Sequence, residues 1–491
     1  MDTPLLLKIE QAKVNYLGKF AFDSLNFSWE KGQHWAILGE SSFHLSAFIE
    51  TLLGTTALIQ GKLTRPFAEE YHRAQQALGA VHSYRDLIAS VSQHYPIRNK
   101  ANQQNFYYQQ RFNSLDLQET VSVLEYLKAH LGAQDGPWDI EQVTSLLRLE
   151  HLLSSSILEL SNGEMRRLAL ALGLLRQPRL FLMDQPLTGL DVESRATFGD
   201  FLAELISKGV HVLLTISSRE IPEQLTHIAR IEGQGTLSSW SRTTYPHFPQ
   251  APLTIPWNLA QLQALLPQEK TIPETLVELN AVCISYGSKT ILKDITWKIR
   301  AGERWRLSGK NGSGKSTLIS LLIGENPQAY SQDFSLFGRK RGSGESIWEL
   351  KKPIGFVAPE LSRFFPRNQT LLKVILSGLM DTMGLFKKPT AAQESLAMEW
   401  IRVFRLEAYQ GDYFHQLPLE VKRWALLARA LIKKPSLLIL DEASQGLDEK
   451  QRIVFRDTLQ WILEHCELTV IYVSHYEEDL PPAVNKLFKL P

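Results

Sequence analysis

The feature that most constrains the fold of this chain is an internal duplication. Gly39 recurs as Gly309, at an interval of 309 − 39 = 270 residues. Further along, Asp184 recurs as Asp441, at an interval of 441 − 184 = 257 residues. The first copy therefore carries about 13 extra residues (270 − 257) between these two landmarks. Self-similarity at so long a period predicts that one domain type occurs twice in tandem.

The segment between the two copies has a composition of its own. Residues 235–275 contain six prolines and only four charged residues. That composition is typical of a semi-extended connector, here with one short helix around 259–266. We therefore predict a first domain over residues 1–234, a linker over 235–275 and a second domain over 276–491. A chain of 491 residues is long enough to give each domain a full core.

Within each copy, short apolar strands alternate with stretches of helical period. The predicted strands are 36–38, 180–183, 212–216, 437–440 and 470–473. Such alternation predicts an α/β fold, in which helices flank a mainly parallel sheet. Residues 120–130 and 391–406 carry helix-period apolar residues in the middle of each copy. They predict a helical subdomain inserted into each sheet core.

The second copy contains a phosphate-binding loop with the sequence GKNGSGKST. Its glycines let successive backbone N–H groups surround a triphosphate, and the helix predicted from Lys315 adds the positive end of its dipole. Lys315 would contact the outer phosphates, and the hydroxyl of Ser316 would hold Mg²⁺. A strand at 304–308 and a helix at 315–323 supply the context that a P-loop NTPase fold requires. The predicted ATP-binding residues of the loop are Gly309, Lys310, Asn311, Gly312, Ser313, Gly314, Lys315, Ser316 and Thr317.

Two acidic residues end an apolar strand about 120 residues after this loop. Asp441 is predicted to bind Mg²⁺, and Glu442 to orient or deprotonate the attacking water. His475 ends the next predicted strand, where its imidazole could contact the terminal phosphate. Tyr286 precedes the loop, and its ring could stack on adenine. A lone histidine or aromatic residue is more often a packed structural residue, so it is the order of the motifs that favours these roles.

This order of motifs resembles the ATP-binding cassette (ABC) family in its twin-cassette form, over nearly the whole chain. The resemblance implies ATP hydrolysis with ATP and Mg²⁺ as cofactors. It also implies two cassettes that face each other head to tail, with each ATP between the phosphate loop of one cassette and the signature loop of the other. The first copy has the signature as LSNGE at residues 160–164. Ser161, Gly163 and Glu164 are therefore expected to contact, in trans, the ATP bound by the second copy.

The first copy has lost three parts that catalysis requires. His44 and Leu45 stand where the second phosphate loop has glycine and lysine, so a phosphate-binding cation is missing. Gln185 stands where the second copy has the carboxylate of Glu442, and Ser218 where it has a histidine. The first phosphate loop is therefore not expected to support hydrolysis.

The second copy has lost its signature instead. Residues 417–421 read LPLEV, in which Pro418 has neither a hydroxyl nor an N–H donor. Glu420 would bring a negative charge towards the terminal phosphate, a repulsion of roughly 4 kcal/mol at ~4 Å and intermediate dielectric. In a head-to-tail pair, the intact phosphate loop of the second copy meets the intact signature of the first, and both damaged parts fall in the other site. The sequence therefore predicts a single hydrolytic site. One departure remains: the family glutamine before the helical subdomain is present as Gln93 in the first copy, whereas the second copy reads Val357-Ala-Pro359-Glu360, where Glu360 or a bound water would substitute.

Two classes of function fit this pattern. The first is the ATPase subunit of a membrane transporter that docks on a separate permease. Residues 330–352 resemble ATP-binding proteins of the ModF type, which are associated with molybdenum transport, mainly over the second copy. The second class is a twin-cassette ATPase without a permease that acts on ribosomes or DNA or in regulation. A non-hydrolysing ATP-binding scaffold is the third hypothesis.

Composition bears on these alternatives. The net charge is +1, from 53 basic and 52 acidic residues, so no overall basic excess indicates a nucleic-acid partner. Ribosome-acting twin cassettes resemble this layout but have a strongly charged linker, and DNA-repair relatives need zinc-binding cysteine clusters. Cys283 and Cys466 are far apart, which fits a reducing cytoplasm. With no apolar run near ~18 residues and no secretion signal, we expect a cytoplasmic protein, with peripheral attachment to the inner face of the cell membrane.

Overall fold

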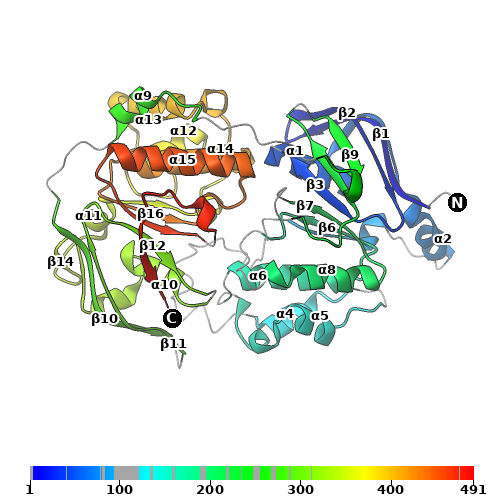
Figure 1. Cartoon of the computed structure of the whole chain (residues 1–491), viewed down its shortest axis with the longest axis horizontal. Coiled ribbons are helices and arrows are strands. Elements are labelled where there is room, and N and C mark those ends of the chain that lie inside the picture. The colour runs from blue at the N-terminus through cyan, green and yellow to red at the C-terminus, as the bar shows by residue number, and fades with distance from the viewer. Residues whose placement is uncertain are drawn as a thin grey trace. The chain divides into compact units, whose positions relative to one another are not determined.

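The structure of the protein is a computed structural model. It describes residues 4–39, 41–77, 79, 83–92, 121–132, 136–157, 160, 162–187, 195–216, 221–233, 235–246, 255–266, 272–286, 289–310, 312–474 and 476–490. These residues form two compact units that divide between residues 251 and 252 (Figure 1). Each unit contains an antiparallel sheet, a mainly parallel sheet and a set of helices, so the predicted α/β class is confirmed.

The first unit has a three-stranded and a six-stranded sheet. The three-stranded antiparallel sheet has the order β2 (Lys19–Glu30), β1 (Leu5–Tyr16) and β4 (Ala57–Thr64). The six-stranded sheet has the order β5 (Ile88–Val91), β6 (Leu180–Asp184), β7 (His211–Thr215), β3 (Trp35–Gly39), β8 (His227–Ile231) and β9 (Leu237–Ser241). Its described α-helices are α1 (Ser42–Leu53), α2 (Glu69–Ala77), α4 (Val123–Ala129), α5 (Ile140–Leu146), α6 (Asn162–Leu174) and α8 (Phe198–Ser207).

The second unit repeats this plan. Its antiparallel sheet has the order β11 (Lys289–Arg300), β10 (Thr275–Tyr286), β13 (Phe334–Leu336) and β14 (Arg339–Lys340). Its parallel sheet has the order β15 (Ile354–Val357), β16 (Leu437–Asp441), β17 (Thr469–Val473), β12 (Arg304–Ser308) and β18 (Lys486–Lys489). Its described α-helices are α9 (Leu259–Leu265), α10 (Lys315–Leu322), α11 (Ile347–Lys351), α12 (Leu371–Ser377), α13 (Ala391–Val403), α14 (Leu419–Leu431) and α15 (Glu449–His465).

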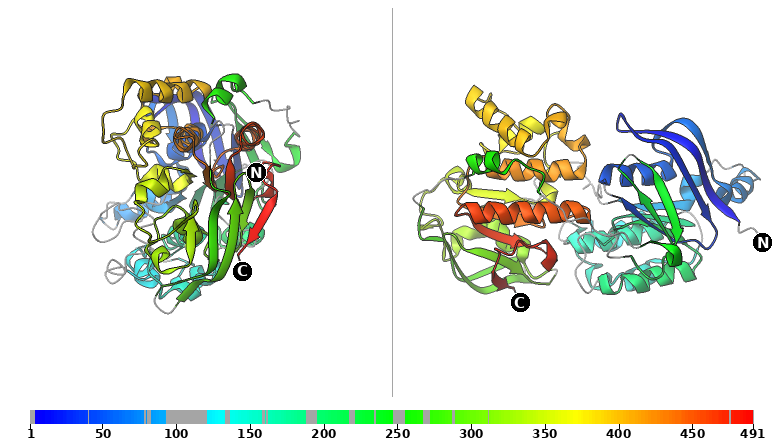
Figure 2. Two further views of the ribbon diagram at one scale, coloured as in Figure 1. Left: turned by 90° about the vertical axis from the view of Figure 1, so that its left-hand side faces the viewer. Right: turned by 45° about the horizontal axis from the view of Figure 1, so that its top comes forward.

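The central parallel strands β6, β7, β16 and β17 are almost wholly apolar because both of their faces are covered. All five residues of β17 are buried, as are all five of β6. In the second unit, one face of the sheet packs against α12 to α15, and the other packs against α10 and the antiparallel sheet. Figure 2 shows these layers from two further sides. A parallel sheet buried on both faces reads as continuous apolar runs, which is why the sequence predicted these strands closely.

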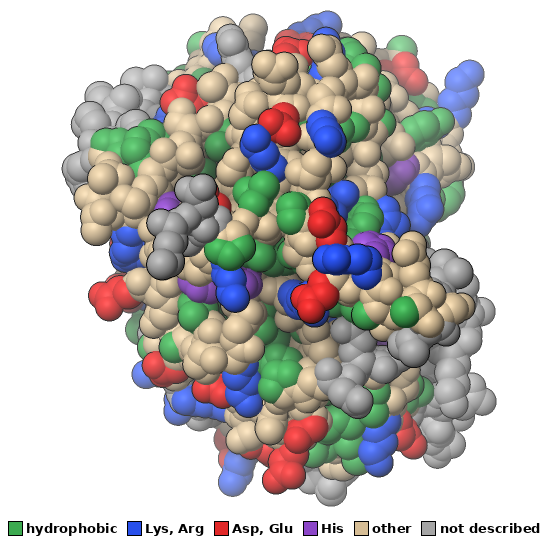
Figure 3. All heavy atoms as spheres, turned by 90° about the vertical axis from the view of Figure 1, so that its right-hand side faces the viewer, with side chains coloured by type: hydrophobic (Ala, Val, Ile, Leu, Met, Phe, Trp, Pro, Cys, Tyr) green, Lys and Arg blue, Asp and Glu red, His purple; other side chains and the backbone are tan. Residues whose placement is uncertain are grey.

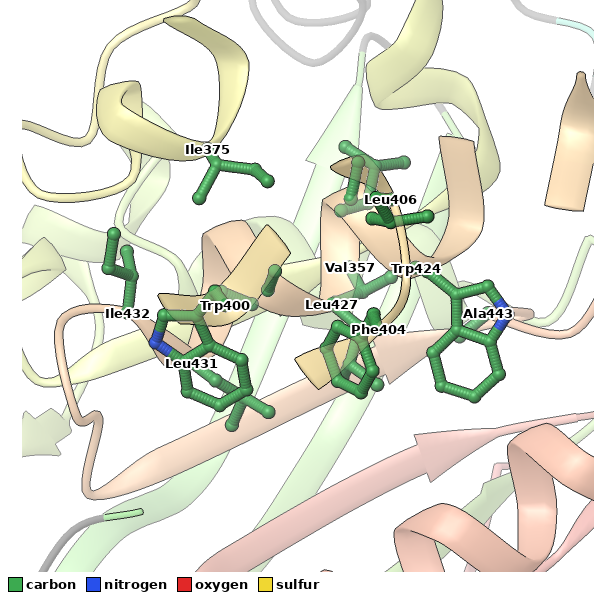
Figure 4. Close-up of a cluster of buried hydrophobic side chains, with 14 of the residues drawn as sticks. Val357, Ile375, Trp400, Phe404, Leu406, Trp424, Leu427, Leu431, Ile432 and Ala443 are labelled. Atoms are coloured by element: carbon green, nitrogen blue, oxygen red, sulfur yellow. The ribbon is translucent and has the colours of Figure 1, made fainter. Parts of the chain in front are cut away.

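The helical subdomain of the second unit has an aromatic core. Trp400 and Phe404 follow one another along α13 and its end, and Trp424 lies on α14 (Figure 4). The Phe404 and Trp424 rings are 5.0 Å apart between centroids, and Trp400 is fully buried. The helix predicted at 391–406 is confirmed as α13.

Parts of the predicted linker belong to the two units themselves. β9 pairs antiparallel with β8 in the first unit. α9 confirms the short helix predicted around 259–266, and its Leu262 and Leu265 are buried in the helical core of the second unit. Just before α9, Trp257 packs on Trp424 at 4.8 Å and donates from Nε1 to Thr458 Oγ1 at 2.9 Å. The second half of this segment is therefore anchored on the second unit.

The surface carries both signs of charge side by side. Figure 3 shows Lys and Arg side chains interspersed with Asp and Glu on the face in view. This mixture matches the net charge of +1 of the whole chain. Within the described ranges, no helix combines the length and the apolar character of a membrane span.

Candidate functional site

The predicted catalytic residues of the second copy gather at one edge of its parallel sheet. The phosphate loop follows β12, and Asp441 and Glu442 stand at the end of β16. β17, which lies between these two strands, ends just before Ser474. Because the strands are parallel, their carboxyl ends meet at the same edge, which is where open α/β sheets bind their ligands. His475 follows β17 directly but lies outside the described residues.

The phosphate loop has the geometry of an anion cradle. Gly312 and Gly314 have φ values of +80° and +91°, a region that favours glycine. A Cβ on Gly314 would lie 2.6 Å from Leu292 Cδ2, so a side chain there would displace the loop. α10 begins at Lys315, whose ammonium donates to the carbonyls of Gly309 and Lys310 at 2.7 and 2.8 Å. The loop therefore curves around a cation at the positive end of a helix.

The residues of this loop fit a Mg²⁺-bound phosphate group. The Oγ atom of Ser313 is buried and has no hydrogen-bond partner within the described part of the chain, and a phosphate oxygen would satisfy it. Ser316 lies in the first turn of α10, and Asp441 lies at the tip of β16. A hydroxyl and a carboxylate are the hard oxygen donors that Mg²⁺ prefers. Asn311, also predicted to bind ATP, lies outside the described residues.

Glu442 is held in a left-handed backbone conformation with φ of +48°. Its N–H donates to the Val473 carbonyl at 2.9 Å, which fixes the turn that follows β16. The side-chain amide of Gln445 donates to Glu442 Oε2. A non-glycine residue in this conformation is costly, and the surrounding hydrogen bonds maintain it.

Two further charged residues lie near Glu442. Glu360 stands in the short helix Pro359–Arg363 after β15, and Arg423 is a buried residue of α14. Burial raises the pKa of the Glu360 carboxyl, the nearby Arg363 opposes the rise, and the negative charge of Glu442 adds to it. Burial lowers the pKa of Arg423 to about 10, against the attraction of both carboxylates. Glu360, the residue expected to substitute for the family glutamine, thus lies close enough to Glu442 for their charges to interact.

Tyr286 ends the long strand β10 next to the phosphate loop helix. Its hydroxyl accepts a hydrogen bond from Asn326 Nδ2 at 2.9 Å. Asn326 is buried and also donates to Ser320 Oγ of α10 at 3.2 Å. The tyrosine hydroxyl is therefore linked through Asn326 to the helix that carries Lys315.

In the described residues of the first copy, which leave out residue 40, a helix takes the place of an open phosphate loop. α1 begins at Ser42, which is equivalent to Gly312 (312 − 42 = 270), whereas α10 begins only at Lys315. The loop has thus been replaced by one extra turn of helix, because Ser42 and His44 stand where the second copy has glycines with positive φ.

Apolar side chains fill the space beside this helix. Leu45 is 3% exposed, and its Cδ2 would lie 3.0 Å from a Cβ placed on Gly39. The Phe43 ring packs on Tyr16 at 5.5 Å, and the His44 ring packs on Phe43 at 5.4 Å. Burial lowers the pKa of His44, so a neutral ring is favoured where a triphosphate would need a cation.

The acid of the first copy is held in an internal network. Asp184 is buried, and Thr215 Oγ1 donates to it at 2.5 Å. Burial raises the pKa of Asp184, and hydrogen bonds from Thr215 and Ser46 oppose that rise. Ser46 is equivalent to Ser316 (316 − 46 = 270). Ser46 and Asp184, the two residues that would bind Mg²⁺ in this copy, are therefore hydrogen-bonded to each other.

The two signature helices begin at equivalent residues. α6 begins at Asn162 and α14 at Leu419, and 419 − 162 = 257. Gly163 is buried and Glu164 partly buried in the first turn of α6. Ser161 lies outside the described residues, as do Gln93 and Ser218. The helix that follows the signature thus begins at the same place in the repeat in both copies.

Three functional candidates were missed by the sequence analysis. They are Gln445, Arg423 and Asn326, which lie outside the motifs used above, although Arg423 recurs in the first copy as Arg166 at the repeat interval (423 − 166 = 257). Gln445 lies three residues after Glu442, and that proximity is the only sequence signal for it. Arg423 and Asn326 come near the site only through the fold.

Comparisons with known proteins agree with this geometry. The family model described as "ABC transporter" matches residues 22–188 and 292–445. The ABC transporter ATP-binding protein ModF of Escherichia coli is 35% identical over 354 residues, covering 70% of this chain and 72% of that protein. An uncharacterized ABC transporter ATP-binding protein of Schizosaccharomyces pombe is 29% identical, covering 95% and 93%. Among solved structures, a model of ribosome-bound archaeal Pelota and ABCE1 has a TM-score of 0.57 at 17% identity, over 94% of this chain and 72% of that one.

Proposed function

Because the chain belongs to the ABC family and is an ATPase with two cassettes, we propose that it hydrolyses ATP at a single site, built on the phosphate loop of the second cassette. The contrast between the two loops carries this proposal. One is an open glycine loop around Lys315, and the other is wound into helix α1 and filled by Leu45. The site is completed in trans by the first cassette through Ser161, Gly163 and Glu164.

Each residue has a chemical task in the proposed reaction. Lys315 and the N–H groups at the start of α10 hold the outer phosphates, and Tyr286 positions the base. Bound Mg²⁺, held by Ser316 and Asp441, would neutralise charge on the phosphates. Glu442 accepts a proton from the attacking water, and His475 contacts the terminal phosphate. Positioning and electrostatic stabilisation, rather than covalent chemistry, supply the rate enhancement in reactions of this kind.

Glu442→Gln tests this assignment directly. The amide cannot take the proton of the water, so we expect turnover to fall at least 100-fold while ATP still binds. Gln185→Glu, which restores the carboxylate in the first copy, is the matched control. It should leave the rate within about twofold, because the segment equivalent to the phosphate loop in that copy is wound into helix α1. Hydrolysis that survives Glu442→Gln, or that rises several-fold with Gln185→Glu, would contradict the single-site proposal.

We further propose that this ATPase drives transport through a separate permease, with a substrate related to molybdate. Support comes from the similarity to ModF, whose name places it among transporter ATP-binding proteins. Cytoplasmic location, with attachment to the inner face of the membrane through that permease, is part of this proposal.

A role without a permease is the second candidate. It is favoured by the fold shared with a ribosome-bound structure of 17% identity, which is a likeness of architecture. Purification of the tagged full chain from detergent-solubilised membranes separates the two. Recovery with an integral membrane protein supports transport, whereas recovery with ribosomes and no membrane protein supports the second candidate.

A further inference from the structure

Gln445 is bonded to Glu442 at two points. Its side-chain amide donates to Glu442 Oε2, and its backbone N–H donates to the Glu442 carbonyl at 2.9 Å. Both residues are partly buried in the turn between β16 and α15. An amide that donates to one oxygen of a carboxylate restricts the rotation of that carboxylate.

Gln445 is itself held from the signature helix of the same cassette. Arg423 of α14 donates from Nε and Nη2 to the Gln445 carbonyl, at 3.1 and 2.9 Å. The Arg423 side chain is buried, so these bonds are not weakened by solvent. A planar guanidinium that donates twice to one oxygen fixes direction as well as distance.

The charge of Arg423 has a further effect. Its Nη1 atom is buried and has no hydrogen-bond partner in the described part of the chain. The negative charges of Glu360 and Glu442 both raise the pKa of Arg423. Arg423 therefore places a positive charge near two carboxylates that would otherwise repel each other. That repulsion is seen in the pKa of Glu360, which the charge of Glu442 raises.

We propose that Gln445 is a positioning residue of the hydrolytic site, which holds the Glu442 carboxylate for the attacking water, and that Arg423 fixes Gln445 in turn. The inference rests on the proposed role of Glu442. It assigns a function to α14, whose N-terminal signature has been lost to Pro418 and Glu420. This helix serves its own cassette, by anchoring the turn that carries the catalytic carboxylate.

Gln445→Met tests the proposal, because methionine has the length of glutamine and no N–H donor. We expect kcat for ATP hydrolysis by the full chain to fall about tenfold with KM for ATP within twofold, since a misplaced catalytic group lowers the rate without loss of substrate binding. Gln410→Ala, which removes an exposed amide from the same unit, is the control and should change neither constant. Wild-type kcat in Gln445→Met would overturn the proposal.

A double-mutant cycle tests the link to α14. Arg423→Lys keeps the charge and loses the paired donors, so we expect kcat to fall several-fold. Because both residues act through Glu442, the double variant should lose clearly less than the product of the two single effects. Fully multiplicative losses would overturn the role given to Arg423, and Gln445→Met alone decides the role of Gln445 if Arg423→Lys does not fold.

If Glu442→Gln stays active, the proposed function fails; if it is inactive while Gln445→Met is not, only this inference fails.

Discussion

Leu45 and Lys315 occupy equivalent positions (315 − 45 = 270), and their surroundings differ accordingly. Lys315 bonds to two loop carbonyls, whereas Leu45 is buried among apolar side chains of the first core. Restoring the lysine therefore cannot restore the site, because the loop around it has become helix.

Leu45→Lys is expected to destabilise the first cassette by about 2–4 kcal/mol, since it buries a charge without a partner and loses apolar packing. Thermal or denaturant unfolding of the full chain measures this loss. Leu17→Lys is the control, because Leu17 is 55% exposed and its replacement should cost less than about 0.5 kcal/mol. A Leu45→Lys chain that is as stable as Leu17→Lys and binds additional ATP would contradict the closed first site.

His34 makes the first cassette sensitive to acid. Burial, together with the charges of His211 and His227, lowers the pKa of His34 to about 4 from its usual 6.5. The folded state thus favours the neutral ring, so its contribution is present above pH 6.5 and is lost as the pH falls towards 4. The shift corresponds to roughly 3 kcal/mol. Lys31 also disfavours protonation of His211, whereas Glu30 favours that of His227.

Hydrogen exchange at pH 7 and pH 5 checks this prediction within one molecule. After correction for the intrinsic pH dependence of exchange, the amides of β3 should lose protection at pH 5. The amides of β12 are the internal control, since Arg304 takes the place of His34 there (304 − 34 = 270). An equal change in both strands would show that the histidine cluster is not the cause.

At the scale of the elements, the sequence predicted the central parallel strands and the order of the site motifs along the chain well. Parallel strands buried on both faces are continuous apolar runs and are therefore easy to recognise. The phosphate loop of the second copy was also predictable, since its glycines and lysine have fixed spacing. The extra turn of α1 was not, because the loss of glycine at 42 and 44 shows only that a loop is damaged and not what replaces it. The network of Gln445 and Arg423 depends on contact between α14 and the turn after β16, which no spacing encodes.

Trp257 joins the linker to the second cassette at the element scale. Its ring packs on Phe404 and Trp424, at 5.5 and 4.8 Å, and its indole N–H bonds to Thr458 of α15. Trp257→Ala should therefore destabilise the second cassette by about 2–3 kcal/mol through lost packing and the lost hydrogen bond to Thr458, whose hydroxyl still donates to the Val454 carbonyl. Thermal unfolding measures the effect, and Trp348→Ala, at a tryptophan that is 56% exposed, is the control. Equal effects of the two changes would mean that the linker is not anchored there.

At the scale of the whole molecule, we propose one nucleotide site for two cassettes. Duplication supplied two copies of each part, and the described structure retains an open phosphate loop only in the second. The first cassette would then serve as the partner that supplies its signature residues, and its own closed loop would be a packed part of its core.

Counting bound nucleotide tests this claim most directly. The Glu442→Gln chain, which should bind ATP without hydrolysing it, is equilibrated with saturating Mg²⁺ and ATP and weighed intact by native mass spectrometry. Lys315→Ala in the same background is the control and should abolish the bound nucleotide. We expect one ATP per chain, lost on Lys315→Ala; two ATP per chain, or one that survives Lys315→Ala, would rule out a single site.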